Sequence, residues 1–172
     1  MAKILQPEKL QGKYVNLREV TVDDAEFILK LRCSNKAKLL HKTENNLQKQ
    51  IDYIKKYLSS NNEWYFIIED KNHIQIGTHR IVNIDNFNFS TESWIMSDDA
   101  KPNETIESFI LIVIYAFNVL NLKCQHFYTN KDNKKMILFA KFIGAREVGF
   151  DGIEYSYEAT RDDYRFFRGE KC

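Results

Sequence analysis

The alternation of apolar and polar positions along the chain predicts a sheet protein with a few helices. Apolar residues alternate or run together as in strands at residues 13–19, 63–70, 74–84, 91–97, 123–129, 147–150 and 155–161. Apolar residues recur at helical spacing in residues 25–32, 47–58, 104–120 and 133–142. The resulting order is one strand, two helices, three strands, a helix, a strand, a helix and two strands. We therefore expect one mixed α/β domain over residues 1–172.

Turn chemistry separates these segments. Polar residues predict a turn at residues 85–90, before the fourth strand. Gly144 follows the last predicted helix and is expected at its C′ position. Residues 161–168 are rich in charge and are most simply a solvated strand end.

Composition narrows the classes of partner. The 172 residues are 44% hydrophobic and 28% charged, and 25 Lys and Arg balance 24 Asp and Glu. The net charge of +1 gives no reason to expect nucleic acid or an anionic membrane as a partner. No apolar run approaches the roughly 20 residues that a membrane helix needs. The three cysteines lack metal-ligand spacing, so we expect no metal, reduced thiols and a cytoplasmic location.

The stretch from residue 91 to residue 122 carries the first functional indication. A predicted strand leads through a polar turn into a helix that is apolar nearly all round. The free N–H groups and the dipole at such a helix N-terminus favour an anionic group such as a phosphate. The stretch has no glycine, although glycine lets a backbone approach phosphates closely.

Four segments together resemble the GNAT acetyltransferases, in the branch of ribosomal-protein N-terminal and amino-sugar N-acetyltransferases. They are LQGKYVNLREVTVDDAEFILKLR, Ile76-Gly77-Thr78, YAFNVLNLK and DNKKMILFAKFIGAREVG. The resemblance implies a mostly antiparallel sheet of seven strands, flanked by four helices and splayed between the fourth and fifth strands. It also implies acetyl-CoA as co-substrate in the splay and direct attack by an amine, without a metal.

The resemblance assigns the cofactor side residue by residue. The pantetheine arm would follow the fourth strand, the pyrophosphate would lie at the next helix N-terminus, and an Asn would contact the arm. The implied residues are Ile95, Met96, Ser97, Lys101, Asn103, Glu104, Thr105, Ile106 and Asn133.

The chain departs from the family pattern at two places. The family motif [QR]-x-x-G-x-[GA] aligns with residues 100–105, where Ala100, Asn103 and Thr105 replace its defining residues. Glu104 and Glu107 are expected in the first helical turn. Their carboxylates would occupy the positive end of the helix dipole, where a pyrophosphate would otherwise bind. Ala140 stands where many relatives carry a Tyr that protonates the leaving thiolate.

The acceptor side rests on residues of the strands and of the region between the first two helices. Glu92 is the candidate general base, with a solvent-facing strand residue as the alternative. Trp94 is expected on the same face as Glu92, either walling the acceptor pocket or packing in the core. Alternation sends His79 and Arg80 to opposite faces, one of them facing the cleft. The remaining substrate-binding candidates are Arg32, which is otherwise a helix-surface residue, His41, Tyr65 and Arg80.

These assignments favour an enzyme that moves an acetyl group from acetyl-CoA to a small polar primary amine, such as an amino-sugar nucleotide. Two alternatives remain open: a protein N-terminal acetyltransferase of the ribosomal-protein type, and a non-catalytic binding domain with a degenerate CoA loop. A small-molecule acceptor, no nucleic acid, no membrane, and either a monomer or a homodimer complete the expectation.

Overall fold

The protein is described by a computed structural model that covers residues 10–39, 43–83 and 85–169. One sheet has the strand order β1-β2-β3-β4-β5-β7-β6, and every pair is antiparallel except the parallel pair β4–β5. The predicted mixed, mostly antiparallel sheet is confirmed. The strands are β1 (Val15–Glu19), β2 (Glu63–Asp70), β3 (Gln75–Asn83), β4 (Asn88–Met96), β5 (Cys124–Asn130), β6 (Arg146–Phe150) and β7 (Glu154–Thr160).

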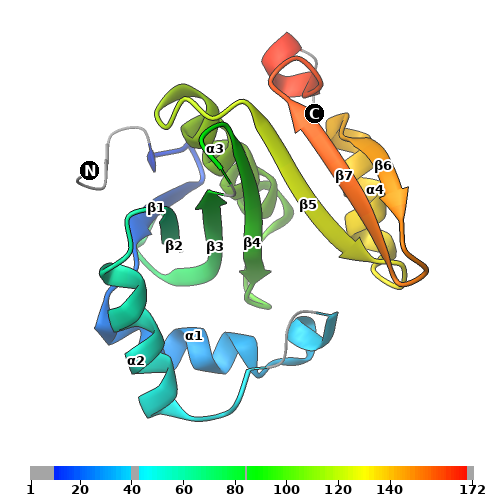
Figure 1. Ribbon diagram of the computed structural model, residues 1–172. Helices are drawn as coiled ribbons and strands as arrows, with labels where there is room; N and C mark the ends of the chain where they lie inside the picture. Colours follow the sequence, from blue (N-terminus) through cyan, green and yellow to red (C-terminus); the bar gives the residue numbers. More distant parts are fainter. Residues whose placement is uncertain (1–9, 40–42, 84, 170–172) are drawn as a thin grey trace.

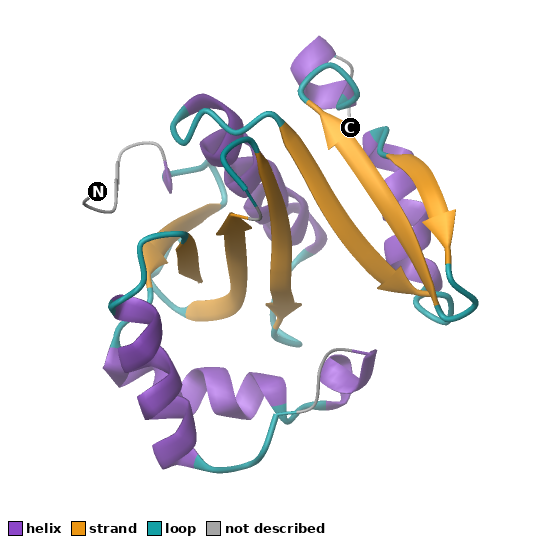
Figure 2. Ribbon diagram, in the orientation of Figure 1, coloured by secondary structure: helices purple, strands orange, loops and turns teal. Residues whose placement is uncertain are grey.

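Helices cover both faces of this sheet (Figures 1 and 2). One face packs against α3 (Pro102–Asn118) and α4 (Lys134–Ile143), and the other against α1 (Ala25–Arg32) and α2 (Leu47–Leu58). Asn side chains cap α2 and α4. Gly144 ends α4 in the left-handed conformation, as predicted. None of the helices in the described part of the chain is long and apolar enough to cross a membrane.

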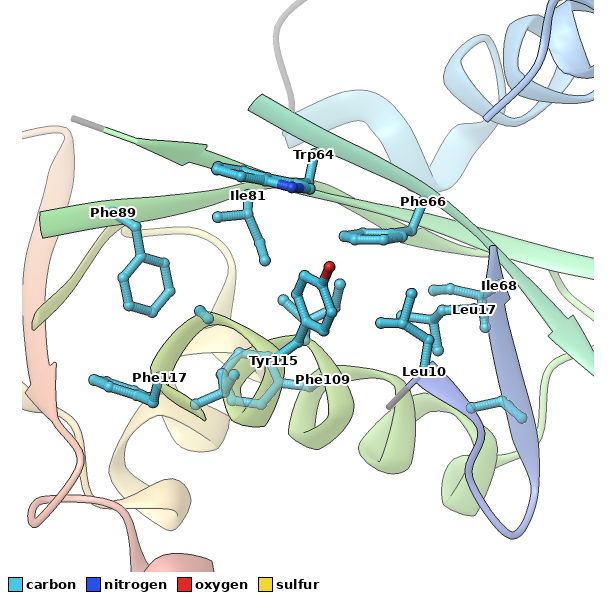
Figure 3. Packing of buried hydrophobic residues seen from close by; sticks show 14 of the residues in the cluster. Leu10, Leu17, Trp64, Phe66, Ile68, Ile81, Phe89, Phe109, Tyr115 and Phe117 are labelled. Carbon is cyan, nitrogen blue, oxygen red and sulfur yellow. The ribbon is translucent and has the colours of Figure 1, made fainter. Parts of the chain in front are cut away.

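Alternation within β2 divides the core between the two faces. Trp64 and Phe66 point toward α3, where they join the large cluster that Figure 3 shows. Tyr65 and Ile67 point the opposite way and pack with buried residues of α1 and α2. Since β2 is buried on both faces, its sequence is almost continuously apolar.

β4 begins three residues earlier than the sequence predicted. Strand structure starts at Asn88, inside the predicted turn 85–90. The turn is shorter because the Asp85 carboxylate accepts hydrogen bonds from the N–H groups of Phe87 and Asn88, both at 2.8 Å. Phe89 is then fully buried in the core, and Ser90 pairs with β5. Burial and cross-strand pairing therefore outweigh the local polar pattern.

The C-terminal segment also differs from the prediction of a solvated strand end. Tyr164 is fully buried against Phe109 and Phe117 of α3, and a short 3-10 helix, Arg165–Arg168, follows it. Phe167 packs on Phe117 in turn. Tyr164 and Phe167 therefore attach this segment to α3, which its many charged residues did not indicate.

Glu107 has a structural role that the sequence did not indicate. It lies in the second turn of α3, not the first, and its carboxylate accepts hydrogen bonds from the N–H groups of Lys13, Tyr14 and Val15, at 2.9, 2.6 and 2.9 Å. A Cβ on Gly12 would lie 2.4 Å from this carboxylate. Glu107 therefore fastens the start of β1 to α3 and takes no part in the helix N-terminus.

Candidate active site

A cleft opens where β4 and β5 separate. The two strands pair only over Asn88–Ser90 and Cys124–His126, and then diverge, as Figure 1 shows. The cleft has a volume of about 760 Å³, and residues of α1, α2, α4 and of the strands β2, β3, β4, β5 and β7 line it. The predicted splay between the fourth and fifth strands is thus present.

A buried chain of polar groups marks the point where the strands part. The side-chain amide nitrogen of Gln125 donates a hydrogen bond to the Thr91 hydroxyl at 2.5 Å, and the side-chain oxygen Oε1 of Gln125 accepts one from the Tyr164 hydroxyl. Gln125 and Tyr164 are fully buried, whereas Thr91 lines the cleft. The backbone pairing of β4 with β5 ends at Ser90, and at the next residue, Thr91, a side-chain hydrogen bond to Gln125 takes its place.

A β-bulge in β4 separates the side chains of Glu92 and Trp94. Arg80 pairs with Glu92 and Thr78 with Ile95, so that one β3 residue opposes two residues of β4. Ser93, the first of those two, has a φ of 53°. The expectation that Glu92 and Trp94 share a face is wrong, because the extra residue reverses the alternation.

Glu92 lies on the face of α1 and α2, within a cluster around Arg80. The Arg80 guanidinium lies 3.7 Å from the Glu92 carboxylate and 2.5 Å from that of Glu63. It also lies over the rings of Tyr53 and Tyr65, 5.5 and 5.4 Å from their centroids. Arg80 is thus occupied by two carboxylates and two rings, while the Glu92 side chain remains 48% exposed to the cleft.

The two tyrosines of this cluster keep their hydroxyl protons. Burial raises the pKa of Tyr65 to about 12, and burial also raises the pKa of Tyr53 above its usual range. Both side chains line the cleft. They present neutral hydroxyl groups that can donate or accept hydrogen bonds.

Arg32 joins the helical side of the cleft to the bulge. Its Nε donates to the Thr43 hydroxyl at 2.8 Å, and its Nη1 lies 3.4 Å from the Ser93 hydroxyl. Lys38 and Lys49 line the same side. His41 falls outside the described residues.

Trp94 and His79 lie on the opposite face, toward α3. Their rings stack at 5.3 Å, and the Trp94 indole N–H donates to the Ser108 hydroxyl at 3.2 Å. Both residues line the cleft, as Arg80 does from the other face. The cleft therefore reaches both sides of the sheet, because the bulge and the splay open it there.

The last residues of β4 pair with β3 along one edge. Along the other edge they do not pair with β5, whose pairing with β4 ends at Ser90. The Ser97 N–H donates to the Ile76 carbonyl at 2.7 Å, so the neighbouring Met96 directs its backbone groups toward the opposite edge. Gly77 allows this close packing, since a Cβ there would lie 2.6 Å from the Met96 sulfur. Ile95 is buried against α1 and the 3-10 helix Asn35–Leu39.

The N-terminus of α3 carries its own capping group. The buried Glu104 carboxylate accepts a hydrogen bond from the Lys101 N–H at 2.7 Å and pairs with the Lys101 ammonium at 3.3 Å. Pro102 has no N–H to offer, and the first intrahelical bond runs from Thr105 to Lys101. Two N–H groups, those of Asn103 and Glu104, remain without helical carbonyl partners. Ile106 is half-buried in the next turn.

Asn133 is the N-cap of α4, and Ala140 lies within this helix. The Asn133 side chain caps the helix through a bond from the Met136 N–H at 3.2 Å, and Asn133 lines the cleft. Ala140 is fully buried in a cluster with Phe127 and Tyr157, whose rings stack on each other. No hydroxyl group is therefore available at position 140.

Only some of the site residues predicted from the sequence line the cleft. Six of them line the 760 Å³ cleft: Arg32, Tyr65, Arg80, Glu92, Trp94 and Asn133. The others with described positions follow along the end of β4 and the start of α3. Sequence reasoning missed further lining residues, because their approach depends on the splay: Tyr53, Thr91, Phe127, Tyr128 and Glu154.

Comparison with known proteins decides the family. The model of the acetyltransferase (GNAT) domain matches residues 15–146. The chain belongs to the GNAT acetyltransferase family. GNAT domains generally use acetyl-CoA as co-substrate. As a member of this family, the chain is an acyl-CoA-dependent N-acyltransferase.

Solved GNAT structures share the fold over most of the chain. Apo FdhC, described as a nucleotide-linked sugar GNAT, is 27% identical with a TM-score of 0.82, over 91% of this chain and 92% of that one. A spermidine N-acetyltransferase SpeG variant from Vibrio cholerae is 18% identical with a TM-score of 0.76, over 92% and 100%. A GCN5-related N-acetyltransferase from Brucella melitensis is 16% identical with a TM-score of 0.75, over 93% and 81%. A comparison with curated protein sequences found no match.

Proposed function

We propose that this GNAT chain transfers an acetyl group from acetyl-CoA to the primary amine of an amino-sugar nucleotide. The single observation that carries the proposal is the position of Glu92. Its half-exposed side chain lines the cleft that opens between β4 and β5. An amine that entered from the side of α1 and α2 would meet this carboxylate.

The donor side is suited to a pantetheine arm and a diphosphate. Beyond Ser90, β4 leaves its edge without β5, so extended backbone groups are available to an amide-containing arm. The N–H groups of Asn103 and Glu104 and the 70% exposed Lys101 side chain can bind phosphate oxygens. The Asn133 side chain would orient the arm from α4.

In the proposed reaction the amine nitrogen attacks the thioester carbonyl carbon. A C–N bond forms and the C–S bond breaks, which releases the CoA thiolate. Glu92 takes one proton from the acceptor ammonium, directly or through one water, so that the neutral amine can attack. The second nitrogen proton passes to solvent as the tetrahedral intermediate collapses. The thiolate takes its proton from solvent, because Ala140 offers no acid.

The charges of the cleft favour an anionic acceptor over a polyamine. Four basic side chains line it, those of Arg32, Lys38, Lys49 and Arg80, against three glutamates. Arg80 pairs with Glu63 and Glu92, and Lys49 pairs with Glu44, so Arg32 and Lys38 are the basic groups placed to meet an anionic acceptor. Guanidinium and ammonium groups bind the diphosphate of a nucleotide sugar, and tyrosine rings offer a stacking surface for a base or sugar. The similarity to FdhC, described as a nucleotide-linked sugar GNAT, supports the same class.

An acceptor screen with acetyl-CoA tests the proposal. Thiol release is expected with nucleotide-linked amino sugars, and the acetylated product should be identifiable by mass spectrometry. Spermidine and peptides with free N-termini serve as competing acceptors. Acetylation of the peptides alone would favour a protein N-terminal acetyltransferase. No binding of acetyl-CoA at millimolar concentration would favour the non-catalytic binding domain.

A further inference from the structure

His79 is a buried histidine in the wall of the cleft that the proposed reaction does not use. It is 1% exposed and stacks on the rings of Trp94 and Phe109, with centroid distances of 5.3 and 6.1 Å. It is also the β3 residue that faces the bulge of β4. The bulge and the aromatic neighbours fix its ring.

The imidazole lacks a partner that its burial requires. Nδ1 of His79 is buried and has no hydrogen-bond partner among the described residues. A buried polar atom without a partner destabilises a fold, so such atoms are rare in stable proteins and call for an explanation. A leucine or phenylalanine would fill an aromatic wall without that cost.

The ring is neutral in the working range of pH. Burial lowers the pKa of His79 to about 3, so the imidazole carries one N–H donor and one acceptor nitrogen. A base needs a pKa near the operating pH. His79 is therefore suited to binding and positioning and unsuited to general-base catalysis.

The face on which His79 lies indicates the ligand. Arg80 and Glu92 point toward α1 and α2, whereas His79 and Trp94 point toward α3 and reach the cleft from that side. We propose, building on the proposed acetyl transfer, that His79 is a positioning residue that hydrogen-bonds the acyl-pantetheine end of the donor. The bound donor would then supply the partner that the folded protein lacks.

Two substitutions separate this role from a structural one. His79→Phe keeps a ring packed on Trp94 and Phe109 and removes both nitrogens. It should raise the Tm of the ligand-free protein and weaken acetyl-CoA binding by about tenfold in calorimetry. His79→Asn keeps an amide group near Nδ1 and should restore most of the affinity. His126→Phe, on β5 outside the cleft lining, is the matched control and should leave affinity unchanged.

The choice of ligand makes the test specific to the arm of the donor. Adenosine 3′,5′-diphosphate lacks pantetheine and should bind His79→Phe and the wild-type protein equally. In the wild-type protein, the ¹⁵N resonances of the His79 ring should move with acetyl-CoA and stay in place with the diphosphate. Unchanged resonances, or unchanged acetyl-CoA affinity in His79→Phe, would overturn the inference alone. A wild-type protein that binds no acetyl-CoA would overturn the proposed function as well.

Discussion

At the scale of single residues, the arrangement around Arg80 determines what Glu92 can do. Arg80 lies between Glu92 and Glu63 and above two tyrosine rings, so it holds the row of side chains in place. An arginine with these partners is a poor site for a substrate phosphate. Arg80 therefore serves the proposed reaction by orienting Glu92, and Arg32 and Lys38 are better placed to meet an anionic acceptor.

Glu92→Gln should lower kcat about 100-fold, because the amide cannot accept the ammonium proton. The acid limb of the pH–rate profile should disappear with it, while acetyl-CoA binding stays close to that of the wild-type protein. Steady-state kinetics across pH provide the measurement. Glu158→Gln, which changes a β7 carboxylate outside the cleft lining, is the control. An unchanged pH–rate profile in Glu92→Gln would remove the assignment.

At the scale of elements, the junction of β4 and β5 sets the geometry of the cleft. Three residue pairs join the strands, and the Gln125 side chain forms the next link. Tyr164, from the C-terminal segment, holds the other end of the Gln125 amide. The last part of the chain thus supports the point at which the cleft opens.

Gln125→Leu should loosen this junction. It leaves the hydroxyl groups of Thr91 and Tyr164 without their partner, which costs about 1–3 kcal/mol of unfolding free energy. The KM for acetyl-CoA should rise more than kcat falls, since the donor lies against the separating strands. Tyr164→Phe removes only the outer hydroxyl and should lower stability with a smaller change in KM. Equal effects of both variants on KM would contradict a positioning role for Gln125.

The N-terminus of α3 is the element in which the chain departs most from its family. In the alignment drawn from the sequence resemblance Asn103 stands at the position of a glycine, and the Glu104 carboxylate accepts a hydrogen bond from the Lys101 N–H. Asn103→Gly should tighten acetyl-CoA binding severalfold if the side chain crowds the diphosphate, because glycine lets the backbone come closer. Calorimetry with acetyl-CoA measures the change, and Asn118→Gly, near the other end of α3, is the control. Weaker binding would instead assign the Asn103 side chain a direct contact with the donor.

At the scale of the whole molecule, Asp24 joins several segments of the fold. Its buried carboxylate pairs with Arg18 at 2.7 Å and accepts bonds from the Thr21 N–H at 2.7 Å and the Gln75 amide at 2.6 Å. Burial alone would raise the pKa of Asp24, but the bonds from Arg18 and Thr21 outweigh it and hold the pKa below its usual value.

This network predicts how stability depends on pH. A lowered carboxyl pKa contributes stability that is complete above the pKa of the unfolded chain and is lost as pH falls through the folded value. Asp24→Asn should therefore cost about 2–3 kcal/mol at pH 7 and flatten the decline of stability below about pH 4. Urea unfolding at several pH values provides the comparison. A variant as stable as the wild-type protein at pH 7 would show that the network contributes little.

The sequence by itself determined the order and type of the elements. Apolar periodicity in β2 and α3 and Gly144 after α4 are local signals, since neighbours in the chain carry them. The four resembling segments added the family and the splay between β4 and β5. They also pointed to Glu92, Arg80 and Asn133, which the cleft brings together.

Only the tertiary structure decided how the side chains meet. The bulge at Ser93 reversed the face of Trp94, and β5 drew Ser90 into the sheet. Glu107 bonds the chain ahead of β1, more than 90 residues away, instead of the helix N-terminus. Strand register, burial and such distant hydrogen bonds depend on partners remote in the sequence. A pattern read along the chain cannot supply those partners, and they are what make the cleft.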